Sequence, residues 1–124
     1  MSNERLILDF VSTKGFHIDN LEPNPDHVHS WALLYEDAID LCQLCRHQLI
    51  PILGGDAISK KQGKYCFTYE SWYTQTMKGE CFSSYLVRTV NTAISFLERH
   101  YMADSSLLYS FTVDPDASYY EKDQ

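Results

Sequence analysis

Four cysteines are the residues of this sequence whose type and spacing most readily suggest chemistry. Cys42 and Cys45 form a CxxC pair, and Cys66 and Cys81 complete the ligand number of a structural zinc site. The spacing argues against zinc, because the CxxC lies inside an apolar helical pattern and the other two cysteines stand alone. A redox pair would begin a helix, where the helix dipole lowers a thiol pKa. We therefore expect reduced thiols that pack as small apolar side chains, and no cofactor.

Three neighbouring residues, Asp26, His27 and His29, form a second group of possible ligands. With His17 as a further nitrogen donor, they would suit a transition metal. Two histidines separated by one residue present their rings on the same side only in an extended segment, whereas these residues are expected to begin a helix. A capping aspartate with two exposed histidines is therefore our interpretation. A metal-binding domain or small metal-dependent hydrolase that uses His17, Asp26, His27 and His29 is the alternative.

Catalytic motifs give no further lead. The sequence contains no GxSxG elbow, phosphate-binding glycine loop, HExxH or dinucleotide fingerprint. Carboxylate pairs such as Asp114 with Asp116, or Glu36 with Asp40, are of types that do acid and base work. Acidic residues in a turn or on a helix face are usually solvated, however, and a catalytic pair needs a buried pocket. We therefore expect a protein that is not an enzyme.

Acidic residues are concentrated between Lys14 and Arg46, where no lysine or arginine interrupts them. Three of these acids fall inside a predicted helix, and a rotation of about 100° per residue places them opposite its apolar stripe. Two leucines flank them, so this face combines charge with apolar area, as a protein interface does. A solvated face whose leucines are covered by another element is the alternative. The predicted contacts with a basic partner are Leu33, Glu36, Asp37, Asp40 and Leu44.

The end of the chain is a second candidate surface. Residues 114–124 combine acidic residues with two tyrosines, and carboxylates with aromatic rings can lie across a basic groove. An unstructured, solubilising segment is the other interpretation. We predict a single compact domain over residues 1–113 and an acidic, mobile tail over 114–124. The candidate contacts in this tail are Asp114, Asp116, Tyr119 and Tyr120.

Two long helices are expected to position these residues. Apolar residues at helical spacing predict one helix over about 27–53 and another over about 80–102. We therefore predict a mainly α domain built on two long antiparallel helices, with shorter helices and room for a small β-sheet over 65–69 and 107–113. The alternative is an α+β domain with a three- or four-stranded sheet. Residues 56–64 are polar and predict a loop.

Two short segments fit both kinds of structure. Residues 5–18 suit a short helix or a hairpin, and residues 65–69 suit a strand or the approach to a helix.

Composition narrows the class of partner. The chain has 124 residues and a net charge of −7, which argues against direct contact with nucleic acid or an anionic membrane. Its first residues resemble neither a secretion signal nor a membrane span, so we expect a cytoplasmic protein.

Small, acidic, aromatic-rich chains without catalytic motifs have the general character of immunity proteins, antitoxins, inhibitors and DNA mimics. We therefore predict a non-enzymatic binding protein that occupies a basic site on a toxin, a nuclease or a nucleic-acid-binding protein. A structural subunit or homodimer, in which Leu33 and Leu44 meet their own copies, is a further alternative.

Overall fold

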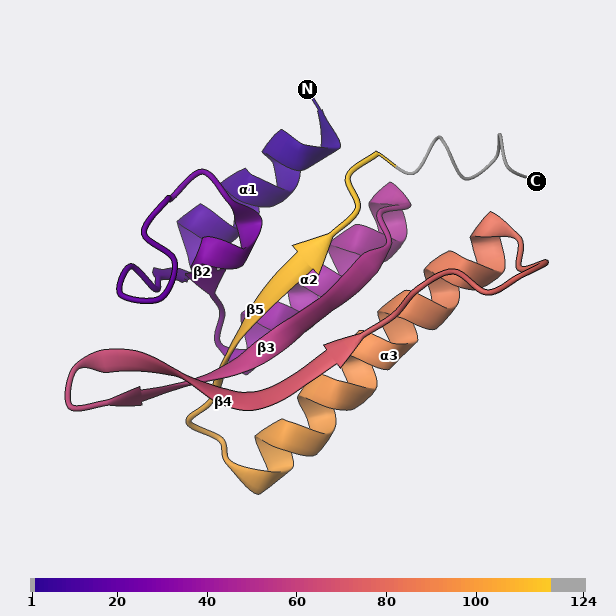
Figure 1. Cartoon of the computed structure of the whole chain (residues 1–124). Helices are drawn as coiled ribbons and strands as arrows, with labels where there is room; N and C mark the ends of the chain where they lie inside the picture. Colours follow the sequence, from indigo (N-terminus) through magenta and orange to yellow (C-terminus); the bar gives the residue numbers. More distant parts are fainter. Residues whose placement is uncertain (1, 117–124) are drawn as a thin grey trace.

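The computed structural model describes residues 2–116, which form an α+β fold (Figure 1). A three-stranded antiparallel sheet has the strand order β4-β3-β5, and β1 pairs with β2 in a two-stranded sheet. A 3-10 turn, η1 (Val28–Ser30), precedes β2. The helices are α1 (Asn3–Lys14), α2 (Tyr35–Gln48) and α3 (Phe82–Ala103), and the strands are β1 (Phe16–His17), β2 (Trp31–Ala32), β3 (Ile52–Lys61), β4 (Lys64–Tyr73) and β5 (Leu108–Val113).

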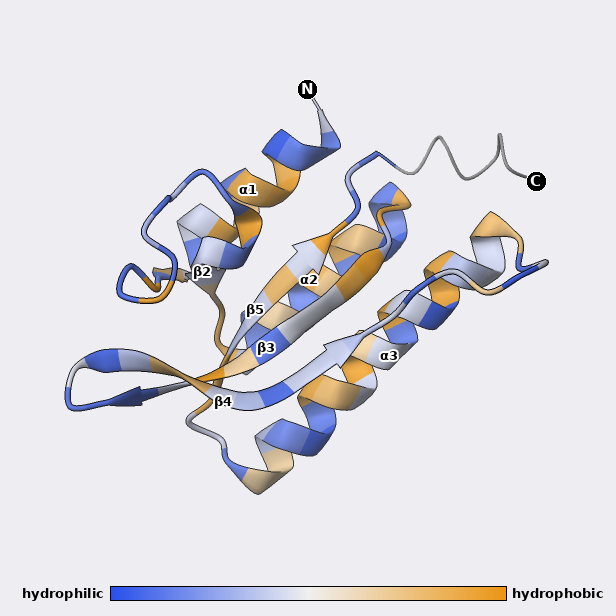
Figure 2. Ribbon diagram, in the orientation of Figure 1, coloured by the Kyte–Doolittle hydropathy of each residue, from blue (hydrophilic) through white to orange (hydrophobic). Residues whose placement is uncertain are grey.

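Helices α2 and α3 cover the same face of the three-stranded sheet (Figure 1). Trp72 of β4 packs on Phe96 of α3, with ring centroids 4.6 Å apart, and meets Phe111 of β5 edge-on at 5.4 Å. Gly55 of β3 lies between Trp72 and Phe111 in the strand register. Hydrophobic residues gather where sheet and helices meet, and the far end of the β3–β4 hairpin is hydrophilic (Figure 2). The sheet and the two helices therefore share one core.

The prediction of a mainly α domain is wrong. The expected helix over 27–53 is much shorter, because Leu33 exchanges two main-chain hydrogen bonds of 2.8 Å with Tyr109 of β5. These bonds hold the chain extended until α2 begins at Tyr35. At its other end, Leu49 adopts a left-handed conformation with φ of 59°, and Ile52 already belongs to β3. Among the apolar residues outside α2, Trp31 and Ile52 are strand residues, and Leu34 and Leu49 are the cap residues of the helix.

The polar segment predicted as a loop also belongs to the sheet. Residues 56–61 continue β3, and β4 pairs with it from Lys64 onward across a two-residue turn. The end of this hairpin extends beyond the helices, so its side chains are exposed and no apolar alternation marks the strands. Residues 5–18 form most of α1 and then β1, and residues 65–69 lie in β4. Within residues 2–116, no helix combines the length and apolar character that crossing a membrane requires.

Candidate functional site

The beginning of α2 and the end of α3 lie side by side because the two helices are antiparallel. Tyr35 stacks on Tyr101, with ring centroids 4.1 Å apart and planes at 15°. Near the opposite ends, Arg46 Nη2 donates a 3.0 Å hydrogen bond to Asn91 Oδ1. We call the surface around the stacked pair the acidic–aromatic face. The name covers Leu34, Tyr35, Glu36, Asp37 and Asp40 at the start of α2, and Glu98, Tyr101 and Met102 at the end of α3. At about 100° per residue, Glu36 is the acid nearest to Tyr35 around α2, and Asp37 and Asp40 lie further round the helix.

The first turn of α2 explains why acidic residues stand at this place. No side chain caps the helix at Leu34, and Glu36 and Asp37 lie in its first turn. Carboxylates are stabilising there because the N-terminal end of a helix carries a partial positive charge. These carboxylates are also accessible to solvent. Glu36 is exposed and Asp37 is half-buried, and Asp40 in the next turn is exposed.

The three carboxylates of α2 have no cationic neighbour that would neutralise them. In the described range 2–116, Glu36, Asp37 and Asp40 form no ion pair and no side-chain hydrogen bond. Other acidic residues of the chain are paired, such as Asp9 with Arg5 at 3.0 Å. The charge of these three residues is therefore available to a partner.

The two leucines predicted to contact a partner beside the acids are not exposed in the structure. Leu33 is 0% exposed and belongs to the core, so a partner or a second copy of the chain cannot contact it in the folded protein. Leu44 is half-buried and packs against the same core. The homodimer contact predicted through this pair is therefore not available.

Exposed apolar area on this face comes from residues that the sequence analysis did not select. Leu34 is 49% exposed and Met102 is 87% exposed. Tyr101 is 37% exposed. Spacing along one helix could not reveal this surface, because the end of α3 meets Tyr35 only through the packing of α3 on α2.

A third tyrosine, Tyr109, is buried in the core and has a raised pKa. Tyr109 of β5 is 0% exposed, and within residues 2–116 its hydroxyl has no hydrogen-bond partner. Burial, followed by the nearby charges of Asp104, Tyr35 and Tyr101, raises the pKa of Tyr109 to about 12. Burial and the charge of Glu98 likewise raise the pKa of Tyr35. The carboxylates that act on these tyrosines, Glu98 and Asp104, lie at the end of α3.

The chain leaves the fold at the other end of α2. The Asp114 amide donates to the Pro51 carbonyl at 2.9 Å, and Pro51 follows α2. Asn3 Nδ2 also donates to the Pro115 carbonyl at 3.4 Å. Asp114 is thus separated from Glu36 by the length of α2. The other predicted contacts are Asp116, which is exposed, and Tyr119 and Tyr120, which lie outside the described residues. The mobile tail over 114–124 stays a prediction.

The predicted metal ligands have other neighbours in the structure. His17 Nε2 lies 3.0 Å from the Glu22 carbonyl oxygen, and the His17 ring stacks on Trp31. His29 Nε2 lies 3.6 Å from a carboxylate oxygen of Glu22. The rings of His27 and His29 are 5.0 Å apart, and Asp26 is exposed. In the described part of the chain, no three histidine, cysteine, aspartate or glutamate side chains are placed to hold a metal ion.

The cysteines divide into buried and accessible thiols. Cys42 and Cys45 are buried on the core side of α2, as the helical pattern predicted. Burial raises the pKa of Cys42 to about 12 and also raises that of Cys45. Cys81 is exposed before α3, and its sulfur is hydrogen-bonded to the hydroxyls of Ser83 at 3.4 Å and Ser84 at 3.3 Å. These hydrogen bonds, of which the one with Ser83 has the largest effect, lower the pKa of Cys81 to about 7.

The lower pKa and greater exposure of Cys81, compared with Cys42 and Cys45, predict that an alkylating reagent modifies Cys81 selectively. At pH 7 a thiol of pKa about 7 is about half thiolate, compared with about 3% for an ordinary cysteine. Iodoacetamide should therefore label Cys81 well before Cys42 or Cys45, as followed by mass spectrometry of peptides. The double substitution Ser83→Ala/Ser84→Ala should slow the labelling of Cys81. Equally fast labelling of Cys42 would contradict its burial in α2.

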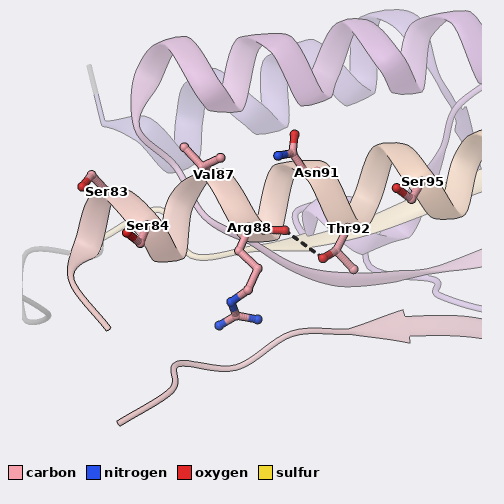
Figure 3. Close-up of a pocket in the computed structure, with 7 residues that line it drawn as sticks. All are labelled: Ser83, Ser84, Val87, Arg88, Asn91, Thr92 and Ser95. Atoms are coloured by element: carbon pink, nitrogen blue, oxygen red, sulfur yellow. Dashed lines mark hydrogen bonds between the residues drawn. The ribbon is translucent and has the colours of Figure 1, made fainter. Parts of the chain in front are cut away.

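A shallow groove of about 770 Å³ runs along the outer side of α3 (Figure 3). Figure 3 shows Val87 and Asn91 on the side of α2, whereas Arg88 points the other way. The Arg88 guanidinium is held by both carboxylate oxygens of Glu80, at 2.7 and 2.8 Å. Every lining residue comes from α3, so the groove is an open helix face without an opposite wall. The lining residues are Ser83, Ser84, Val87, Arg88, Asn91, Thr92 and Ser95.

The structure is that of a small α+β protein whose three α2 carboxylates form no ion pair within residues 2–116. Residues 20–113 match the family model Imm40, described as immunity protein 40. This range covers 94 of the 124 residues, and the chain therefore belongs to the immunity protein 40 family. No curated protein matches the chain. Membership of an immunity protein family indicates a non-enzymatic protein that binds a toxin, in agreement with the inhibitor and immunity protein predicted from the sequence.

Proposed function

We propose that this protein neutralises its toxin by covering a basic site of the toxin with the acidic–aromatic face. The observation that supports this most directly is the set of three α2 carboxylates without an intramolecular cation in residues 2–116. A basic site on a toxin is typical of one that acts on nucleic acid. In that case Glu36, Asp37 and Asp40 stand in for phosphates, and the protein acts as a DNA mimic in the cytoplasm.

In this proposal, the charged residues act on the rate of association and the apolar residues act on the rate of dissociation. Unpaired surface carboxylates accelerate the encounter with a basic partner, and salt screens this effect within about 10 Å at 0.1 M. Exposed Leu34 and Met102 provide apolar area that is removed from water in the complex. Because rim charges act mainly on association, the apolar contacts set the rate of dissociation.

The first test identifies the toxin. The tagged protein is used to recover binding proteins from its native host, with washes at increasing salt, and mass spectrometry identifies them. We expect a basic protein that salt releases, and whose toxicity on expression is relieved by co-expression of this chain. Recovery of only neutral or acidic partners, or a toxin that this chain does not relieve, would remove the proposal.

Charge reversal then tests the acidic–aromatic face. In Asp37→Lys/Asp40→Lys, we expect association with the toxin to slow by about tenfold or more at low salt, because steering is reversed. The dependence on salt should become flatter. Asp37 lies in the first turn of α2, so this change also costs about 0.3–1 kcal/mol of stability through the helix dipole. Surface plasmon resonance at several salt concentrations measures the rates.

The matched control is Asp19→Lys/Glu70→Lys. Both residues are exposed and lie away from α2, and the change in net charge is the same. The control should change the association rate far less. Equal effects of the two double variants would show that net charge alone matters, and unfolding of the α2 variant would show that the face is structural.

A further inference from the structure

The stacked pair of Tyr35 and Tyr101 is the feature of the acidic–aromatic face that can recognise a particular side chain. The faces of aromatic rings are negative and attract cations, and arginine does this more often than lysine because its planar guanidinium also stacks. Tyr101 is 37% exposed, so a partner can reach it. The charge of Glu98 acts on Tyr35 at the same place. The pair therefore offers a negative aromatic surface beside a carboxylate.

The first turn of α2 adds to the attraction of this surface for a cation. Glu36 follows Tyr35 in that turn and is exposed, and within residues 2–116 it forms no ion pair. Tyr109 takes no part in the contact, because its hydroxyl is fully buried and a partner cannot reach it in the folded protein.

We propose that an arginine side chain of the toxin docks on the Tyr35–Tyr101 pair, beside Glu98. This rests on the proposed function, because it names the group of the toxin that the acidic–aromatic face receives. Guanidinium has five N–H donors in a rigid plane, so one arginine can meet an aromatic face and a carboxylate together. Lysine would satisfy the charge but not this geometry. Arginine and tyrosine are also the residue types enriched where a few contacts dominate binding.

Removal of the outer ring is the first test, with the toxin recovered as described above as the probe. Tyr101→Ala should weaken toxin binding by about 30-fold or more, as expected for a residue at the centre of an interface. The matched control is Tyr73→Ala, which removes an exposed tyrosine from the edge strand β4 and should leave binding unchanged. A larger loss from Tyr73→Ala than from Tyr101→Ala would move the interface to β4 and overturn the inference.

Tyr109→Phe is a second control, at a tyrosine that a partner cannot reach. This change removes one buried hydroxyl that has no partner within residues 2–116, so thermal stability should stay the same or rise. Toxin binding should stay unchanged, because Tyr109 is 0% exposed. A loss of binding as large as that of Tyr101→Ala would overturn the inference, because the exposed ring would then not be the specific contact.

Substitution in the toxin identifies the group that docks. Each interface arginine of the toxin is changed to lysine, which keeps the charge. One such change should reproduce the loss seen with Tyr101→Ala, and combining the two should add little further loss, because both remove the same contact. If no Arg→Lys change weakens binding, the arginine is excluded while toxin neutralisation stands. If the unmodified protein neutralises no toxin, the proposed function itself fails.

Discussion

Leu33→Ala is expected to lower the free energy of unfolding by about 2–5 kcal/mol, the usual cost of deleting a buried leucine side chain. Leu33 is 0% exposed and belongs to the core, between β2 and the start of α2. The cavity left by alanine cannot close easily, because two hydrogen bonds fix the Leu33 main chain to Tyr109. Urea unfolding followed by circular dichroism measures the change.

The adjacent leucine provides the control. Leu34 is 49% exposed, so Leu34→Ala should cost less than about 1 kcal/mol. The midpoint of thermal unfolding should fall by about 4 °C for each kcal/mol lost, so the two variants differ clearly. Toxin binding should show the opposite order, with the folded Leu34→Ala variant the weaker binder. Equal stability of the two variants would mean that Leu33 is not packed as described.

Gly55→Ala is expected to cost about 3 kcal/mol, at the upper end of the usual range for overpacking. A Cβ atom at this position would lie closer than 3.0 Å to the Ser110 carbonyl oxygen and to the Trp72 ring. Neither neighbour moves freely, since Ser110 belongs to β5 and Trp72 is packed on Phe96. Denaturant unfolding gives the loss.

Two comparisons test whether the clash is the cause. Gly63→Ala meets no atom within 4 Å, and its φ of 81° alone should cost about 1–2 kcal/mol. Phenylalanine lacks the Trp72 ring atoms that the new Cβ would meet, so Gly55→Ala/Trp72→Phe should be more stable than the sum of the two single changes by about 0.5 kcal/mol or more. Strict additivity would locate the cost of Gly55→Ala elsewhere.

The two helices were the most predictable part of the fold. The predicted range 80–102 nearly coincides with α3, because this helix buries one side and exposes the other, so its apolar residues keep a helical period. The first helix was predicted too long at both ends. Trp31 and Ile52 lie in strands that border α2, and their apolar character matched its period by coincidence. Short buried apolar runs cannot be assigned to helix or strand by period alone.

Only the acidic residues of the candidate site could be predicted from the sequence. Glu36, Asp37 and Asp40 belong to one helix, so their common side follows from rotation along that helix. The α3 residues of this face are brought to the start of α2 by tertiary packing, which no local sequence pattern reveals. Leu33 and Leu34 show the same limit, because a strand contact with Tyr109 decides which leucine is buried. The polar residues of the β3–β4 hairpin escaped detection because strands without a buried side show no alternation.

The Tyr35–Tyr101 stack joins residues that are 66 positions apart in the sequence (101 − 35). A ribosome has to synthesise most of the chain before both rings exist, and α3 and β5 have to fold onto α2 before they meet. Proteolysis between these helices would likewise leave neither fragment with the whole recognition surface. Under the proposed function, protection against the toxin would therefore require that α2 and α3 remain parts of one folded chain.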